Sequence, residues 1–267
     1  MRIVLIGAGR LATNLGKALR DAGHDIVAVW SRTAENAEAL SCMLGASSTT
    51  DVDTLPTDAD AYILSVKDSA LAQLIPQVTK GREEALFLHT AGSMPLSLFE
   101  GYARRYGVFY PMQTFSKERQ VCFAEIPVFI EGTDAAIRPL AESVSQRVYE
   151  LSTDERKYLH LAAVFACNFA NHCYALSAEV LEKHGLPFDV MLPLIDETAR
   201  KVHDLHPADA QTGPAVRYDE NVISMQAQLL ADAPLMQEVY RLLSRSIHDK
   251  SSKYDQLRLT EDTCHRA

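Results

Sequence analysis

Short apolar runs alternate with amphipathic stretches along the first part of the chain, from Met1 to about Ser152. Runs of about four to eight apolar residues are typical of buried strands, and apolar positions three and four apart are typical of helices. The runs that predict strands are 2–6, 25–30, 46–48, 61–66, 85–89, 108–110, 128–131 and 147–151. Helical patterns fall between them at 11–19, 34–44, from Ser69 onward and near 135–145. This alternation predicts an α/β fold, a doubly wound and mainly parallel sheet with helices on both faces.

The pattern becomes purely helical after Thr153. One long helical pattern covers 154–183 and ends at Gly185, and Pro187 opens the next helix. Further helices are predicted at 199–205, 221–230 and 235–248, with loops at 206–213 and 232–234 between them. We therefore predict an α/β domain over 1–152, an all-α domain over 153–259 and a disordered tail over 260–267.

A glycine-rich turn joins the first predicted strand to the first predicted helix. It has the form G-x-G-x-x-A and comprises Gly7, Gly9, Arg10, Leu11 and Ala12. In this strand–turn–helix context the motif is the dinucleotide-binding fingerprint of a Rossmann-type domain. The first glycine permits the tight turn, the second lets a pyrophosphate approach the backbone, and the alanine keeps helix and strand close. The helix N-terminus offers free N–H groups to the phosphates.

The end of the second strand indicates which dinucleotide is bound. NAD sites place a carboxylate there to hold the ribose 2′-hydroxyl. This chain instead has Arg32 between two hydroxyl residues, Ser31 and Thr33. A guanidinium suits a 2′-phosphate, so the sequence predicts NADP. The alternative is that Arg32 is a solvated surface cation and Thr33 caps the following helix.

Composition limits the remaining functions. The 267 residues are 47% hydrophobic and 23% charged, with a formal net charge of −9, which argues against partners such as nucleic acid or an anionic membrane. No apolar run approaches the ~20 residues of a membrane span, and no signal peptide is expected. The five cysteines are scattered without a C-x-x-C pair, which predicts reduced thiols in a cytoplasmic protein and no metal site.

Ligands of an open α/β sheet bind at the carboxyl ends of its strands. Val66 and Lys67 follow the fourth strand and are candidate cofactor contacts, whereas Asp68 is better explained as the cap of the next helix. His89 ends the fifth strand and is a candidate proton donor, because the histidine pKa lies near neutrality. The alternative for His89 is a hydrogen-bonded structural histidine.

Two further segments are candidates for binding a substrate. Gln113 and Thr114 follow an X-Pro step at the end of the sixth strand and either line a substrate site or form an irregular edge. Arg217 lies in a Gly-Pro loop before a helix that Asp219 would cap. Its guanidinium could bind a substrate carboxylate, or it could pair with Asp219 or Glu220 at the surface.

The long helix carries polar residues in an otherwise apolar stretch, 159–176. Lys157, His160, Asn168 and Asn171 fall within an arc of roughly 80° on an ideal helix. Such a stripe needs polar partners, which a substrate cleft beside the nicotinamide would supply. A satisfied core network or a polar seam between subunits would supply them equally well.

With these residues in view, the chain resembles a family of Rossmann-like oxidoreductases whose helical half is called domain of unknown function 2520. That family is related to pyrroline-5-carboxylate reductases, ketopantoate reductases and β-hydroxyacid dehydrogenases. The resemblance covers nearly the whole chain and is carried by 7–12, 110–115, 160–168, 212–214, Arg217 and Asp219. It implies an NADP-binding domain, a helical domain that forms much of a homodimer, and an active site between the two domains.

One departure from the relatives affects the chemistry. The β-hydroxyacid dehydrogenases use a lysine four residues before an asparagine of the long helix, where this chain has Val164 before Asn168. The proton donor therefore stays open between His160 and His89, with Asn168 and Asn171 as further catalytic candidates. The leading hypothesis is an NADPH-dependent reductase of a C=O or C=N bond in a small, carboxylate-bearing metabolite, for which the resemblance implies a ketopantoate-like compound as one candidate. The rival hypothesis is a non-catalytic NADP-binding sensor or scaffold protein.

Overall fold

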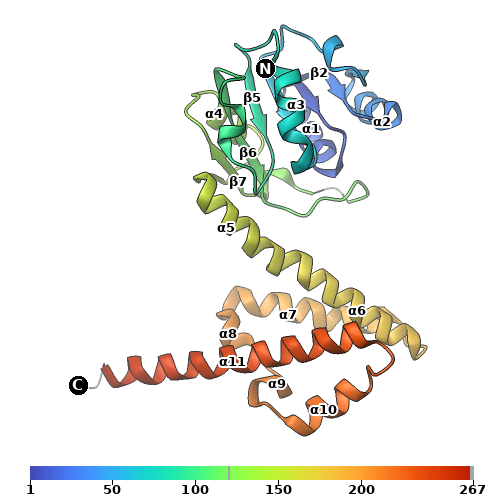
Figure 1. Cartoon of the computed structure of the whole chain (residues 1–267), viewed down its shortest axis with the longest axis vertical. Helices are drawn as coiled ribbons and strands as arrows, with labels where there is room; N and C mark the ends of the chain where they lie inside the picture. Colours follow the sequence, from blue (N-terminus) through green and yellow to red (C-terminus); the bar gives the residue numbers. More distant parts are fainter. Residues whose placement is uncertain (120, 265–267) are drawn as a thin grey trace. The chain divides into compact units, whose positions relative to one another are not determined.

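The computed structural model describes residues 1–119 and 121–264, with side chains as far as Tyr254. The chain divides into two compact units, Met1–Ala170 and Asn171 onward. The first unit holds the sheet and the second is helical (Figure 1). The division falls inside the long helix, whereas the sequence analysis places it before that helix, near residue 152.

An eight-stranded sheet forms the centre of the first unit, with the strand order β3-β2-β1-β4-β5-β6-β7-β8. The first six strands are parallel, β7 runs antiparallel to β6, and β8 runs parallel to β7. The order reverses between β1 and β4, which is the topological switch point where such sheets bind ligands. The strands are β1 (Arg2–Ile6), β2 (Asp25–Trp30), β3 (Ser47–Thr49), β4 (Ala61–Leu64), β5 (Leu86–His89), β6 (Arg105–Pro111), β7 (Val128–Glu131) and β8 (Val148–Glu150).

Helices cover both faces of this sheet, which confirms the predicted doubly wound fold. One core cluster packs α1, α2 and α4 against residues such as Ile3 and Leu5, and the other packs α3 against their neighbours Val4 and Ile6. Successive residues of β1 thus point to opposite faces, and all of them except Arg2 are buried. The helices are α1 (Arg10–Asp21), α2 (Ala34–Leu44), α3 (Asp68–Thr79) and α4 (Ile137–Glu142), with 3₁₀ turns η1 (Val52–Thr54), η2 (Leu96–Phe99) and η3 (Phe123–Glu125).

The predicted long helix is continuous but not uniform. It comprises α5 (Thr153–Ala163), a π-helical stretch η4 (Val164–Phe169) and α6 (Ala170–Lys183). Ser152 and Glu155 form a capping box at its start. Gly185 adopts a left-handed conformation (φ 68°) after its end, and the Leu186 N–H donates to the Leu181 carbonyl. The predicted glycine stop is therefore confirmed.

The start of this helix belongs to the first unit because a buried ion pair ties it to the sheet. The Arg156 guanidinium donates to Glu131 Oε2 of β7 at 3.0 Å and to the Met94 carbonyl at 2.8 Å. Glu131 Oε1 also accepts from the Thr153 backbone N–H at 2.8 Å. The Arg156 side chain is 1% exposed, and burial lowers the pKa of its guanidinium while Glu131 opposes that shift. These contacts explain why a boundary at residue 152 does not separate the compact units.

The second unit is built from helices that pack around α11. Helix α11 (Pro234–Cys264) contacts α8 (Pro207–Ala210), α9 (Pro214–Arg217) and α10 (Glu220–Gln228), and α7 (Leu192–Asp204) follows the turn η5 (Phe188–Met191). Asp219 caps α10 as predicted, accepting from the Val222 N–H at 3.3 Å. Residues 260–264 of the predicted tail belong to α11, and 265–267 lie outside the described residues.

Within the described residues, no helix combines the length and apolar character that crossing a membrane requires.

Candidate functional site

The glycine turn lies at the switch point of the sheet, with its two glycines in different surroundings. Gly7 has a φ of 115°, and a Cβ there would collide with the Ser65 carbonyl at the end of β4. A Cβ on Gly9 would meet no atom within 4 Å. Ala12 is fully buried between α1 and the sheet. Gly7 thus permits close packing of two strand ends, while Gly9 leaves its backbone open to a ligand.

A cleft of about 330 Å³ begins at this turn and extends to the end of β2. It brings together seven of the predicted cofactor residues: Gly7, Gly9, Arg10, Ser31, Arg32, Val66 and Lys67. Leu11, Ala12 and Thr33 do not line it; Thr33 is the N-cap residue of α2, and its Oγ1 accepts from Asn36 Nδ2 at 2.6 Å. The sequence analysis did not single out Asn36, Ser65 or Lys117, which also line the cleft.

The charge of this cleft fits an NADP phosphate group. Among the described residues, four cationic side chains line it and no carboxylate does: Arg10, Arg32, Lys67 and Lys117. In a protein with a net charge of −9, such a cleft supplies the positive potential locally. Asp68 is the first residue of α3 rather than its cap, and its carboxylate accepts from Ser93 Oγ at 2.5 Å. That prediction was therefore wrong, because the helix begins one residue earlier than the pattern suggests.

A second cavity, of about 550 Å³, contains the predicted residues Gln113, Thr114, His160 and Asn168. Strand β6 and its following loop form one wall, and α5 with η4 forms the other. The volume lies within the range typical of small-molecule sites. In the part of the chain that the structure describes, no carboxylate lines this cavity: its other residues are Tyr110, Met112, Phe115, Leu159, Ala162, Ala163, Ala166 and Cys167.

The Tyr110 hydroxyl and His160 Nδ1 form a hydrogen bond of 3.0 Å in this cavity. Tyr110 is 9% exposed, and burial raises the pKa of its hydroxyl, so that the group is protonated at neutral pH. The bond occupies one ring nitrogen of His160 and leaves Nε2 without a partner among the described residues. His160 is thus held in one orientation with a nitrogen free for a ligand.

The loop after β5 links the two cavities. Thr90 Oγ1 donates to Ser65 Oγ at 3.2 Å, and Ser65 lines the cofactor cleft. Two residues later, a Cβ on Gly92 would lie 2.6 Å from His160 Nδ1. Gly92 therefore allows the histidine ring to pack directly on this loop. The sequence analysis did not single out Gly92, because nothing local shows what packs against it.

The structure argues against His89 as a proton donor. Its side chain is fully buried and lines neither cavity, and its Nδ1 accepts from the Ala91 N–H at 3.2 Å. Burial, reinforced by the charge of Arg156, lowers its pKa to about 4, although the Pro95 backbone and Asp68 oppose this shift. His89 is therefore neutral at physiological pH. It packs on Phe99 with a centroid distance of 5.8 Å, as a structural histidine does.

The predicted polar stripe of the long helix does not act as one group. Lys157 is exposed and pairs with Asp154 at 3.0 Å. The π-helical stretch changes the angular spacing beyond Ala163, so the arc expected for an ideal helix does not hold. Asn168 lines the cavity, whereas Asn171 is exposed and belongs to the second unit. Along α5, Arg156 is the only fully buried residue.

Arg217 lies at the end of α9 in the second unit and is exposed. Among the described residues, no ion pair joins it to Asp219 or Glu220, so the predicted surface pairing is not seen. Its role as a carboxylate clamp stays a prediction.

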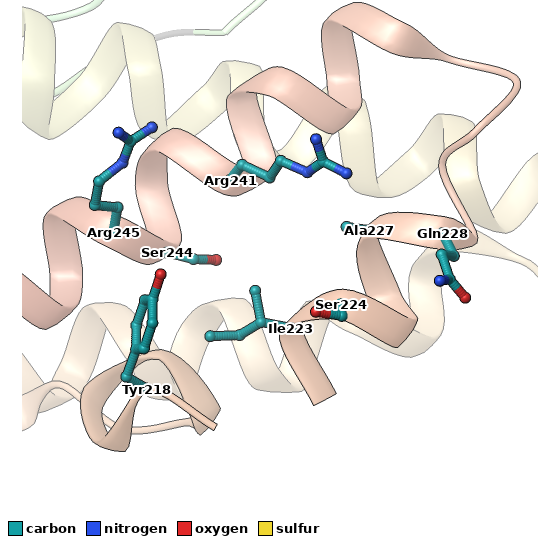
Figure 2. A pocket seen from close by; sticks show the side chains of 8 residues that line it. All are labelled: Tyr218, Ile223, Ser224, Ala227, Gln228, Arg241, Ser244 and Arg245. Atoms are coloured by element: carbon teal, nitrogen blue, oxygen red, sulfur yellow. The ribbon is translucent and has the colours of Figure 1, made fainter. Parts of the chain in front are cut away.

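The second unit has a cavity of its own, of about 460 Å³, between α10 and α11 (Figure 2). Arg241 and Arg245 lie one turn apart on its rim, and both are exposed. Figure 2 shows that their guanidinium groups do not converge on one point. None of the residues predicted from the sequence lines this cavity. It therefore lacks the convergent polar groups that distinguish the two cavities of the first unit.

Comparisons with known proteins address the family directly. Residues 2–91 match the family described as NADP oxidoreductase coenzyme F420-dependent, and residues 126–247 match a domain of unknown function, DUF2520. A search of curated proteins finds no match. Among solved structures, a protein from Bacteroides fragilis described as an NADP oxidoreductase is 58% identical. The alignment covers 93% of this chain and 98% of that one, with a TM-score of 0.90.

The chain belongs to this family of NADP oxidoreductases. The resemblance drawn from the sequence is confirmed, as is NADP as the cofactor of this oxidoreductase. An imine reductase from Myxococcus stipitatus in complex with NADP⁺ shares the fold at 18% identity, covering 96% of this chain and 95% of that one, with a TM-score of 0.64. A reductive aminase from Aspergillus terreus, solved with NADPH and ethyl-5-oxohexanoate, is 17% identical over 96% of this chain and 99% of that one, with a TM-score of 0.66.

We predict that Arg32 selects NADPH over NADH in this oxidoreductase. Arg32→Ala should weaken NADPH binding by about 1.5–3 kcal/mol, the range for a charge-assisted hydrogen bond, and leave NADH binding nearly unchanged. Titration of the intrinsic fluorescence with each cofactor measures both affinities. Equal losses of affinity for NADPH and NADH would show that Arg32 does not bind the 2′-phosphate.

Proposed function

We propose that this oxidoreductase reduces a C=O or C=N bond of a small metabolite that bears a carboxylate, with His160 as the proton donor. The observation that carries the proposal is the hydrogen bond between the Tyr110 hydroxyl and His160 Nδ1 in a cavity of about 550 Å³. NADPH, when bound, supplies the hydride. The imine reductase and reductive aminase that share the fold make reduction of such bonds a reasonable class of reaction.

The protein's part in this reaction is to supply and place a proton. Hydride addition to the carbon of a C=O or C=N bond leaves charge on the oxygen or nitrogen, which must gain a proton. His160 would donate it from Nε2, since Nδ1 is engaged by Tyr110. Asn168 would hold the reacting oxygen or nitrogen within reach, and Gln113 and Thr114 would contact the rest of the substrate. Arg217 is the proposed partner of the substrate carboxylate.

The test is a screen of NADPH oxidation at 340 nm against α-keto acids, simple ketones, cyclic imines and mixtures of carbonyl compounds with amines. We expect turnover with members of the carboxylate-bearing group and much less with their esters. NADPH binding without turnover of any of these classes would contradict the proposal and favour the sensor hypothesis. Equal turnover of esters and acids would show that the enzyme does not recognise a substrate carboxylate, and would contradict that part of the proposal.

We also propose that the protein is a cytoplasmic homodimer assembled through the long helix. Tyr158, Leu161, Phe165 and Phe169 recur at helical spacing and are 76%, 52%, 64% and 49% exposed. Contiguous exposed apolar surface of this kind marks protein interfaces. Free thiols at Cys42, Cys122, Cys167 and Cys173 suit a reducing compartment.

The expected result of light scattering at micromolar concentration is a particle of twice the 29.5 kDa chain mass. Phe165→Asp should shift the population toward monomer, because it places a charge in the apolar face. Tyr102→Asp, at an exposed aromatic residue elsewhere in the first unit, is the matched control and should leave the mass unchanged. A stable wild-type monomer would refute the assembly.

A further inference from the structure

The segment that follows β6 is fastened beside the cofactor cleft. Asn14 of α1, which is 9% exposed, donates through Nδ2 to the Ser116 carbonyl at 3.0 Å and to the Arg10 carbonyl at 2.9 Å. The Phe115 ring stacks on Phe123 with a centroid distance of 6.1 Å and packs against the core. The backbone just before Lys117 is therefore tied to the first turn of the helix that opens at the glycine motif.

This fastening places Lys117 at the end of the cleft where β2 finishes. Lys117 Nζ donates to Asn36 Oδ1 at 3.4 Å, and Asn36 in turn donates to Thr33 Oγ1 at 2.6 Å. Lys117, Asn36 and Arg32 all line the cleft, although they come from different parts of the sequence. The end of the second strand is where a Rossmann-type site holds the adenosine ribose.

The contact with Asn36 does not satisfy the Lys117 ammonium. An ammonium has three N–H donors, and a single neutral amide oxygen at 3.4 Å is a weak acceptor for it. No carboxylate lines the cleft, and Lys117 forms no ion pair with another described residue. Lys117 is exposed, so water meets its remaining donors, and a dianionic phosphate at this end of the cleft would replace that water with a charged acceptor.

We propose that Lys117 is a second ligand of the NADP 2′-phosphate and, together with Arg32, determines the preference for NADP. Arg32 contributes a planar fork from the end of β2, and Lys117 contributes a point charge from the segment after β6. Asn36 holds the lysine in position when the phosphate is absent. The inference concerns the cofactor alone and is independent of the substrate and the proton donor.

The test measures dissociation constants for NADPH and NADH in wild-type protein, Lys117→Ala and Arg119→Ala. Arg119 is the matched control, an exposed cation two positions further along that does not line the cleft. Lys117→Ala should weaken NADPH binding about 5- to 20-fold and NADH binding less than about twofold, because only NADPH carries the 2′-phosphate. Arg119→Ala should leave both affinities within about twofold. Lys117→Arg should retain most of the preference for NADPH.

Binding of 2′-AMP and 5′-AMP provides a second measurement that isolates the phosphate. Lys117→Ala should weaken 2′-AMP and leave 5′-AMP unchanged. Equal weakening of NADPH and NADH would place Lys117 on the pyrophosphate, and unchanged affinities would make it a surface cation; either result overturns the proposal. These outcomes require no turnover, so they stand whether or not the reduction proposed above is correct.

Discussion

Replacing His160 with glutamine should lower turnover by at least 100-fold while leaving the melting temperature and NADPH affinity near their wild-type values. A positioned general acid contributes ~10²–10⁴-fold, and a glutamine amide retains some polar contacts but is far too weak an acid to transfer a proton. The ring lies in a cavity, bonded to the Tyr110 hydroxyl at 3.0 Å, so its removal opens no hole in either core cluster. The measurement is steady-state NADPH oxidation with a substrate found in the screen.

His89→Gln is the matched control for this experiment. His89 is fully buried with a pKa lowered to about 4, so its replacement should reduce the melting temperature more than the turnover per folded molecule. Tyr110→Phe should lower turnover less than His160→Gln does and more than His89→Gln does, since it retains the ring but frees Nδ1 of His160. If His160→Gln and His89→Gln both turn over at near-wild-type rates, the proton comes from water or from another group.

The second large effect is expected from breaking the buried pair between Glu131 and Arg156. Glu131→Ala should lower the free energy of unfolding by about 3–5 kcal/mol, because it leaves a buried guanidinium without its counter-charge. The Arg156 side chain is 1% exposed and that of Glu131 is 17% exposed. The same change removes the acceptor of the Thr153 N–H at the start of α5. Urea unfolding followed by circular dichroism measures the loss.

The surface pair of Glu150 with Arg138 is the control for that measurement. Its side chains are 72% and 44% exposed at a separation of 2.5 Å, so Glu150→Ala should cost less than about 1 kcal/mol. A similarly small loss for Glu131→Ala would mean that Arg156 is solvated in solution. A double variant, Glu131→Leu with Arg156→Met, should recover part of the loss, because no unpaired charge is then buried.

Local patterns were sufficient for the α/β half of the fold and for the cofactor. A short apolar run is enough to predict a buried strand such as β1, and a G-x-G-x-x-A turn can be recognised within six residues. Arg32 in place of a carboxylate is likewise a local signal, and the NADP prediction that it carries is confirmed. The stop of the long helix at Gly185 follows from one residue's freedom to adopt a positive φ.

Only the tertiary structure decided which distant side chains meet. Tyr110 and His160 are fifty residues apart, and Lys117 and Asn36 are eighty-one apart, so no periodicity could pair them. His89 and His160 look alike in the sequence, since both end or interrupt apolar segments. Only burial distinguishes their roles, because His89 is fully buried and His160 is not. The Glu131–Arg156 pair moved the start of the long helix into the first unit, and the π-helical stretch changed which of its polar residues face the cavity. Sequence patterns report what a segment does with its own neighbours, whereas these contacts depend on how the segments pack.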